Sequence, residues 1–66
     1  MNLRINGKNE EIEKTSNMAE LILRKDLSPE KIVVEHNFNI LSKEEWNTTM
    51  LNENDNIEIL SFVQGG

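Results

Sequence analysis

The sequence contains no cysteine, and this absence limits how the chain can be stabilised and what it can bind. Without thiols it forms neither disulfides nor thiolate metal sites, so packing alone must hold the fold. A single domain is expected, because the chain has 66 residues, and a domain of this size buries only about 60% of its unfolded surface. The core must therefore be compact and regular. The lack of cysteine also fits a reducing compartment, and we expect the protein in the cytoplasm.

Long apolar runs and basic residues are also scarce. No stretch approaches the ~20 apolar residues that cross a bilayer, and the N-terminus lacks the regions of a signal peptide, so we expect a soluble protein without a membrane partner. The chain has 7 basic residues against 12 acidic ones, and the net charge of −5 repels phosphate backbones. We therefore expect no nucleic-acid partner. The acidic excess favours a partner with a basic surface, although it also serves to keep a small protein soluble.

The residues of common catalytic sites are few. The single histidine, His36, has no neighbouring nucleophile for a Ser/His/Asp triad, and one histidine without cysteine does not assemble a transition-metal site. We predict that His36 is a solvated residue at a strand end or turn and that the carboxylates are scattered over solvent-facing sides. A glycine-rich phosphate loop is absent, so the chain should not bind ATP by itself. These observations predict a protein that is not an enzyme and has no metal or cofactor of its own.

The first half of the chain has the pattern of a hairpin followed by a helix. Apolar residues alternate over residues 1–5, which predicts a half-buried strand, and the Asn-Gly pair at 6–7 predicts a hairpin turn. A second strand should run to about Glu13 at a sheet edge, with Ile12 as its main buried contact. A helix should then lie on the sheet and end before the Ser-Pro pair at 28–29. It should begin with a capping box of Asn17 and Glu20, with Thr15 or Ser16 as alternative caps. Its apolar stripe consists of Met18, Leu21 and Ile22.

The second half of the chain predicts two more strands and one helical turn. A strand should run from Ile32 to about His36, followed by a turn at 37–39 and a brief pairing at 40–41. A helical turn is predicted at 42–46, with Trp46 packed against the core. After a turn at 52–55, a last strand should run to about Val63. In this last strand, Ile57 and Ile59 share one face, while Leu60 and Phe62 share the other.

The order of these elements predicts an α+β fold in which one main helix packs against a small mixed sheet. If the first and last strands are central and parallel, the helix forms the crossover between them. This is the β-grasp, or ubiquitin-like, arrangement. We expect a folded domain over residues 1–63 and a flexible Gly-Gly tail over residues 64–66.

The whole chain resembles the thiamine-biosynthesis sulfur carrier proteins, the ThiS family of the ubiquitin-like superfamily. The resemblance depends on the first strand and its turn, the helix at 18–24, the segment "VVEHNFNILSKEEW", and the ending "NENDNIEILSFVQGG" with its terminal glycines. Two positions depart from the family: Asn54 stands where glycine is frequent, and the helix entry at 15–16 lacks a glycine. Both departures concern the geometry of loops and leave the tail unchanged.

The resemblance implies a mechanism centred on the tail. An E1-like adenylyltransferase would use ATP to adenylate the carboxylate of Gly66, and a persulfide sulfur donor would convert it to a thiocarboxylate that supplies thiazole synthase. Gln64 and Gly65 would form the rest of the tail, because glycine backbone can enter a narrow channel. Leu60 and Phe62 are candidates for docking the adenylating enzyme, with ordinary core packing as the alternative.

Three other functions remain open at this point. The small subunit of molybdopterin synthase shares the predicted fold and tail, although those chains are generally longer. A ubiquitin-like modifier would be conjugated through Gly66 to lysines of target proteins. A non-covalent binding module would have no use for the two glycines.

Overall fold

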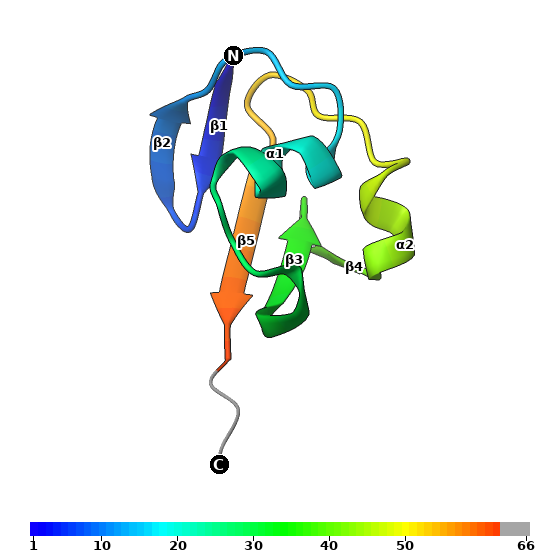
Figure 1. The fold of residues 1–66 in the computed structure, drawn as a ribbon. Coiled ribbons are helices and arrows are strands. Elements are labelled where there is room, and N and C mark those ends of the chain that lie inside the picture. The colour runs from blue at the N-terminus through cyan, green and yellow to red at the C-terminus, as the bar shows by residue number, and fades with distance from the viewer. Residues whose placement is uncertain (63–66) are drawn as a thin grey trace.

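The computed structural model describes residues 1–62, which form a five-stranded mixed sheet with α1 lying across one face (Figure 1). The elements are β1 (Asn2–Ile5), β2 (Lys8–Glu11), α1 (Met18–Arg24), a 3-10 turn (Pro29–Lys31), β3 (Ile32–His36), β4 (Asn39–Leu41), α2 (Lys43–Trp46) and β5 (Asn56–Ser61). Within these residues, no helix is long and apolar enough to span a membrane.

The first and last strands lie side by side near the centre of the sheet. The strand order is β2-β1-β5-β3-β4, with β1 and β5 parallel and every other neighbouring pair antiparallel. A parallel pair needs a crossover, and α1 lies in the connection between them. This confirms the predicted β-grasp arrangement.

The core lies between α1 and the sheet. Met18 and Leu21 of α1 are fully buried, and Ile22 is almost so, which confirms the predicted helical stripe. Trp46 of α2 is buried at a flank of this core, also as predicted. The other buried apolar residues come from the strands and one loop: Leu3, Ile5, Ile32, Val34, Leu51, Ile57 and Ile59.

Hydrogen bonds at the start of α1 explain why the helix begins at Met18. The side-chain oxygen of Asn17 accepts a bond from the Glu20 N–H at 2.9 Å, and the Glu20 carboxylate accepts one from the Ser16 N–H at 2.6 Å. These bonds satisfy backbone donors that have no partner within the helix. The helix ends at Arg24, and Asp26 follows with a φ of 57°, so the chain turns before Pro29 as predicted.

Several predicted strand limits differ from the structure, and one is the start of β4, which lies at Asn39 inside the predicted turn at 37–39. β2 ends at Glu11 rather than near Glu13, and Ile12 leaves the strand while its N–H still donates to the Met1 carbonyl at 2.8 Å. Ile12 nevertheless packs against the core as expected. β5 ends at Ser61, and the predicted strand end at Val63 lies outside the described residues.

Candidate functional site

The strand β5 leads from the middle of the sheet toward the C-terminal residues (Figure 1). Its first half is hydrogen-bonded to β1. The Arg4 N–H donates to the Asp55 backbone carbonyl and the Asn6 N–H donates to the Ile57 carbonyl, both at 2.9 Å. β1 ends at Ile5, but the Asn6 side-chain oxygen then accepts a bond from the Ile59 N–H at 2.7 Å. The Asn6 side chain therefore adds a hydrogen bond to β5 beyond the end of β1.

The two faces of β5 have opposite environments. Ile57 and Ile59 point into the core, whereas Leu60 is 55% exposed and Phe62 is 44% exposed. Neither side chain belongs to the buried core, so the alternative of ordinary core packing is wrong for Leu60 and Phe62. The Phe62 N–H donates to the Lys31 carbonyl at 2.9 Å, so the backbone remains fixed to the sheet region one residue after β5 ends.

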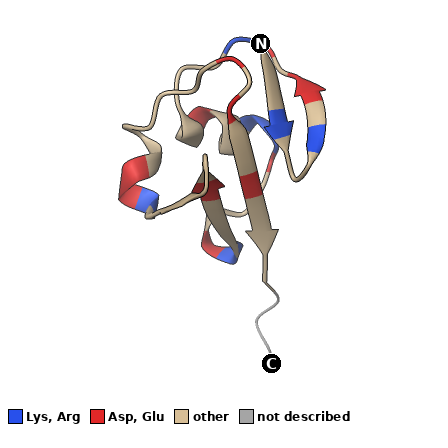
Figure 2. Cartoon of the chain, turned by 180° about the vertical axis from the view of Figure 1, so that it is seen from behind, with Lys and Arg blue, Asp and Glu red and all other residues tan. Residues whose placement is uncertain are grey.

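Other side chains share the face that carries Leu60, which is the face that α1 does not cover. Val33 of β3 lies directly opposite Leu60, and Glu35 lies between Glu58 of β5 and Ile40 of β4. We call these five residues the outer sheet face; Figure 2 views the sheet from this side. Sequence reasoning did not place Ile40 here, although it is 69% exposed.

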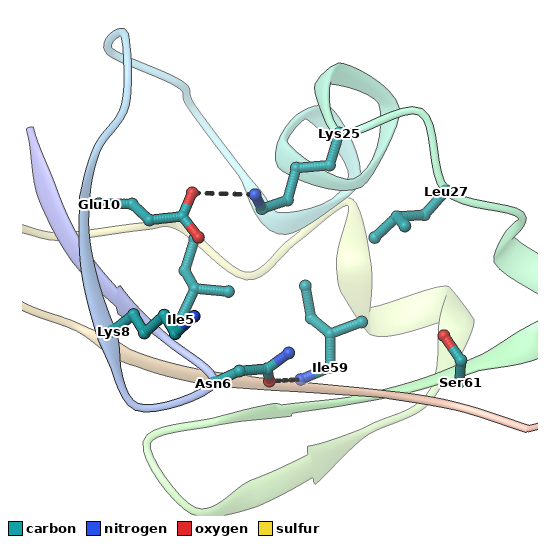
Figure 3. A pocket seen from close by; sticks show the side chains of 8 residues that line it. All are labelled: Ile5, Asn6, Lys8, Glu10, Lys25, Leu27, Ile59 and Ser61. Carbon is teal, nitrogen blue, oxygen red and sulfur yellow. Dashed lines mark hydrogen bonds and ion pairs between the residues drawn. The ribbon is translucent and has the colours of Figure 1, made fainter.

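Shallow pockets flank the end of β5 on the helix side. One, of about 370 Å³, lies between the first hairpin, β5 and the end of α1, where Lys25 pairs with Glu10 at 2.9 Å (Figure 3). A second, of about 490 Å³, includes Leu27 and Phe62. Within residues 1–62, no three His, Cys, Asp or Glu side chains gather as metal ligands.

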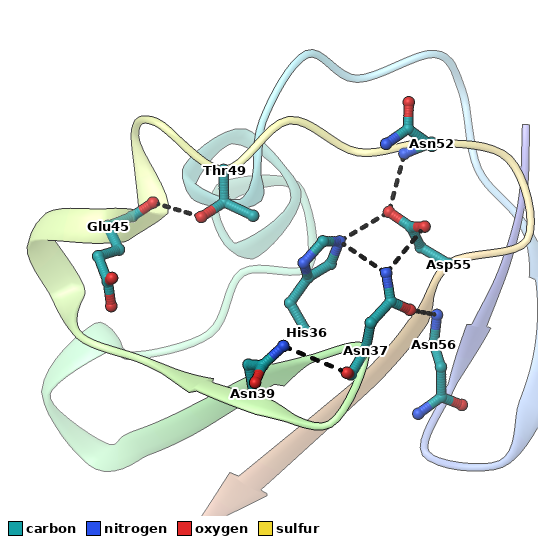
Figure 4. A network of polar contacts seen from close by, with 8 residues as sticks. All are labelled: His36, Asn37, Asn39, Glu45, Thr49, Asn52, Asp55 and Asn56. Carbon is teal, nitrogen blue, oxygen red and sulfur yellow. Dashed lines mark hydrogen bonds and ion pairs between the residues drawn. The ribbon is translucent and has the colours of Figure 1, made fainter.

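A polar network lies at the other end of β5, where His36 contacts Asp55 (Figure 4). The Asp55 carboxylate accepts bonds from His36 Nε2 at 2.7 Å, from Asn37 Nδ2 at 3.2 Å and from the Asn52 N–H at 2.9 Å. The prediction that His36 is solvated is wrong, because its side chain is only 18% exposed, although it does stand at a strand end. Asp55 is buried too, so the carboxylates are not all on solvent-facing sides.

Opposing effects act on the pKa of Asp55. Burial of the carboxyl raises its pKa, but hydrogen bonds from His36, the Asn52 N–H and Asn37, with attraction to the His36 charge, outweigh burial. The pKa of Asp55 therefore lies below its ordinary value. The network joins the β3-β4 turn to the start of β5.

The turn before Asp55 explains one departure from the family pattern. Asn54 adopts a φ of 69°, in the left-handed region that glycine enters without strain. Asparagine tolerates this region better than most residues, and the Asp55 N–H closes the turn on the Asn52 carbonyl at 3.1 Å. The turn therefore forms without glycine.

A family model described as the ThiS family matches residues 3–66 of the chain. This chain belongs to the ThiS family. The match continues past the described residues, so it includes Gly65 and Gly66. Proteins of this family are non-catalytic sulfur carriers in thiamine biosynthesis. The family therefore makes the chain a ThiS-type sulfur carrier of thiamine biosynthesis.

Two curated relatives of this ThiS chain are similar along most of its length. A thiazole synthase of Magnetococcus marinus is 30% identical over 66 residues, which are 100% of this chain and 20% of that protein. The uncharacterised protein ycf40 of Trieres chinensis is 36% identical over 62 residues, which are 94% of this chain and 85% of that protein. The chain thus spans about a fifth of the first relative and most of the second.

Two solved structures of a thiamine biosynthesis protein from Geobacter metallireducens, a ThiS, have the same fold. The crystal structure superimposes with a TM-score of 0.85 at 32% identity and covers 100% of both chains. The solution structure has a TM-score of 0.82 at 30% identity and covers 100% of this chain and 88% of that one. These likenesses confirm the α+β fold. Gln64, Gly65 and Gly66, the predicted tail, lie outside the described residues.

Proposed function

We propose that this chain carries sulfur on the carboxyl group of Gly66. The family match, which reaches Gly66 and includes both final glycines, is the observation that carries the proposal. In this proposal residues 1–63 are the domain, and residues 64–66 are the tail that carries the sulfur. Glycine suits such a tail, because a backbone without side chains enters a narrow channel easily.

The Gly66 carboxylate needs activation, because a carboxylate is a poor electrophile. An E1-like adenylating protein joins it to AMP, consuming ATP and releasing pyrophosphate. The terminal sulfur of a persulfide then attacks the carbonyl carbon, and AMP leaves. A thiol reduces the resulting acyl disulfide, which releases the thiocarboxylate and forms a new disulfide on the donor side. ATP binds to the adenylating protein, so this chain needs no cofactor of its own.

We propose thiazole synthase as the acceptor of the sulfur. The relative in Magnetococcus marinus supports this pairing, because a segment similar to all of this chain belongs to a protein named thiazole synthase. The thiocarboxylate sulfur is a nucleophile, which suits transfer to an electrophilic carbon of a substrate. Since activation consumes ATP and thiols, the cytoplasm is the proposed location.

Leu60 and Phe62 are the proposed docking residues for the adenylating protein. Both side chains are exposed although they follow the core residues of the same strand. Aromatic and large apolar residues on an open surface frequently anchor interfaces. Their position near the end of β5 brings a partner that covers them close to the tail.

Intact mass spectrometry tests the proposal directly. The chain is incubated with ATP, an E1-like adenylating protein, a cysteine desulfurase as persulfide source and a thiol, beside a variant lacking Gly66. We expect a mass increase equal to one oxygen-to-sulfur exchange in the full chain and none in the variant. With enzymes shown to be active on a known carrier, an unchanged mass contradicts the proposal. Adducts to other proteins instead indicate a modifier.

A further inference from the structure

Two glutamates face each other across the central strands of the outer sheet face. Glu35 of β3 and Glu58 of β5 are directly opposite in the antiparallel register, and both are half-buried. Residues directly opposite in such a pair have Cβ atoms about 4.5–5.5 Å apart, so like charges there destabilise the sheet. Figure 2 shows the two acidic bands on neighbouring strands of this face.

Neither carboxylate is compensated within residues 1–62, because no ion pair joins Glu35 or Glu58 to a cation there. Arg4 of β1 also lies on this face, but its partner in the parallel register is Asn56, two residues before Glu58. The network of Asp55 and His36 lies at the end of the strands and bonds to neither glutamate. No ion pair within residues 1–62 therefore offsets the like charges of Glu35 and Glu58.

Apolar side chains adjoin the two carboxylates on the side of β4 and toward the end of β5. Ile40 stands beside Glu35 on β4, and the directly opposed pair of Val33 and Leu60 lies two residues along the same strands. A partner that covers these residues excludes water from the carboxylates as well. Removing water strengthens the attraction between opposite charges and makes an unpaired carboxylate costly.

We propose that Glu35 and Glu58 together receive one arginine or lysine side chain of the adenylating protein, whose surrounding apolar surface covers Leu60, Val33 and Ile40. This inference rests on the proposed function and adds the chemistry of the partner. An arginine fits best, because its planar guanidinium has donors for two carboxylates at once. A second copy of this chain does not fit, since two such faces together would bring four carboxylates into contact.

The test replaces each carboxylate with its neutral isostere in Glu35→Gln, Glu58→Gln and the double variant. Glu44→Gln is the matched control, because it removes the same charge from an exposed position on α2, outside the outer sheet face. For each chain we would measure the Kd for the adenylating protein by calorimetry, the Tm of the chain alone, and thiocarboxylate formation by mass.

We expect the double variant to lose affinity for the adenylating protein without losing stability. The double variant should keep or raise the Tm, since repulsion is removed, while its Kd rises at least about tenfold. Glu44→Gln should bind like the original chain, and added salt should weaken the original chain more than the double variant.

The possible failures are distinguishable. If the original chain is thiocarboxylated and the double variant binds as tightly, the carboxylate pair is not the recognition site. A lower Tm together with weaker binding also overturns the inference, because it shows a structural role. If the original chain is neither bound nor thiocarboxylated, the proposed function fails, and this inference fails with it.

Discussion

The side-chain oxygen of Asn6 accepts a hydrogen bond from the backbone N–H of Ile59 at 2.7 Å, which ties the first turn of the chain to its last strand. Asn6 has a φ of 52° and Gly7 a φ of 81°, so the same asparagine also forms the turn that joins β1 to β2. Ile59 immediately precedes Leu60 in β5. The turn thus helps to set the position of the residue proposed to dock the adenylating protein.

Replacing Asn6 with glycine should separate these two roles. Asn6→Gly tolerates the positive φ but has no side-chain acceptor, so we expect the free energy of unfolding to fall by about 1 kcal/mol or slightly more. Asn6→Asp keeps an acceptor oxygen and should retain most of the stability. Urea denaturation measures the change, and faster amide exchange at Ile59 in Asn6→Gly identifies its cause. Unchanged protection of that amide would rule out the assigned role.

Phe38 should be a site where a single substitution stabilises the protein. It has a φ of 73° in the β3-β4 turn and is 80% exposed, so it is strained and gains little from burial. A side chain in the left-handed region costs about 1–2 kcal/mol, and glycine removes this cost. Glycine also makes the unfolded chain more flexible, which offsets part of the gain, so Phe38→Gly should raise the free energy of unfolding by about 1 kcal/mol. Phe38→Ala keeps the Cβ atom and serves as the control. Equal stability of the two variants would contradict the strain.

Asp55 should make the stability of the protein depend on pH in the acid range. Its pKa is lower in the folded chain than in the unfolded one, so its contribution is complete above the unfolded pKa and is lost as pH falls through the folded pKa. Asp55→Asn should cost about 2 kcal/mol at neutral pH, because charge-assisted bonds are lost, and should flatten this acid dependence. Asp26→Asn, at an exposed turn, is the control. Denaturation at several pH values measures both effects, and curves that coincide for Asp55→Asn and the original chain would refute both.

Leu60 should matter for binding and little for stability. Leu60→Ser removes an exposed side chain, so we expect stability to change by less than about 0.5–1 kcal/mol while the Kd for the adenylating protein rises about tenfold or more. Leu23→Ser is a matched control, since Leu23 is 78% exposed on α1 rather than on the outer sheet face. Calorimetry and thermal unfolding measure the two quantities. Equal binding by the two variants would remove Leu60 from the interface.

Phe62 allows the same separation at the end of β5. Phe62→Ser should weaken binding to the adenylating protein and leave the Tm nearly unchanged, because the side chain is 44% exposed and its backbone bond to Lys31 remains. Binding and unfolding are measured on the same preparation. A large loss of Tm would show that the Phe62 side chain stabilises the fold, so weaker binding by this variant would not identify a docking contact.

The elements of the fold were predictable because their signals are local. Alternation in β1, the apolar stripe of α1 and the capping boxes depend on residues within one or two turns of each other. The contact of His36 with Asp55 joins residues 19 positions apart and depends on the β3-β5 register, which alternation alone does not determine. For this reason the sequence predicted a solvated histidine, and the structure shows a bonded one.

The candidate site was predictable in part for the same reason. The opposite faces of β5 follow from strand geometry, but which face α1 covers is a tertiary property. β4 has three residues, too few for a period, so Ile40 was assigned to a face only by the pairing of its neighbour Leu41 with the buried Val34. The positive φ of Phe38 is also set by tertiary structure. Because His36 pairs with Asn39, only two residues remain for the turn, and such a turn requires a positive φ that phenylalanine does not favour.

The central place of β5 has a consequence for the synthesis of the protein. This strand joins β1 to β3 and supplies Ile57 and Ile59 to the core, yet every other helix and strand of residues 1–62 precedes it. While the strand is still inside the ribosome, the two hairpins have no shared neighbour and the apolar stripe of α1 has only part of its cover. Native structure should therefore appear late, in one cooperative step after β5 emerges. A nascent chain should therefore be unable to bind its partners before β5 has been synthesised.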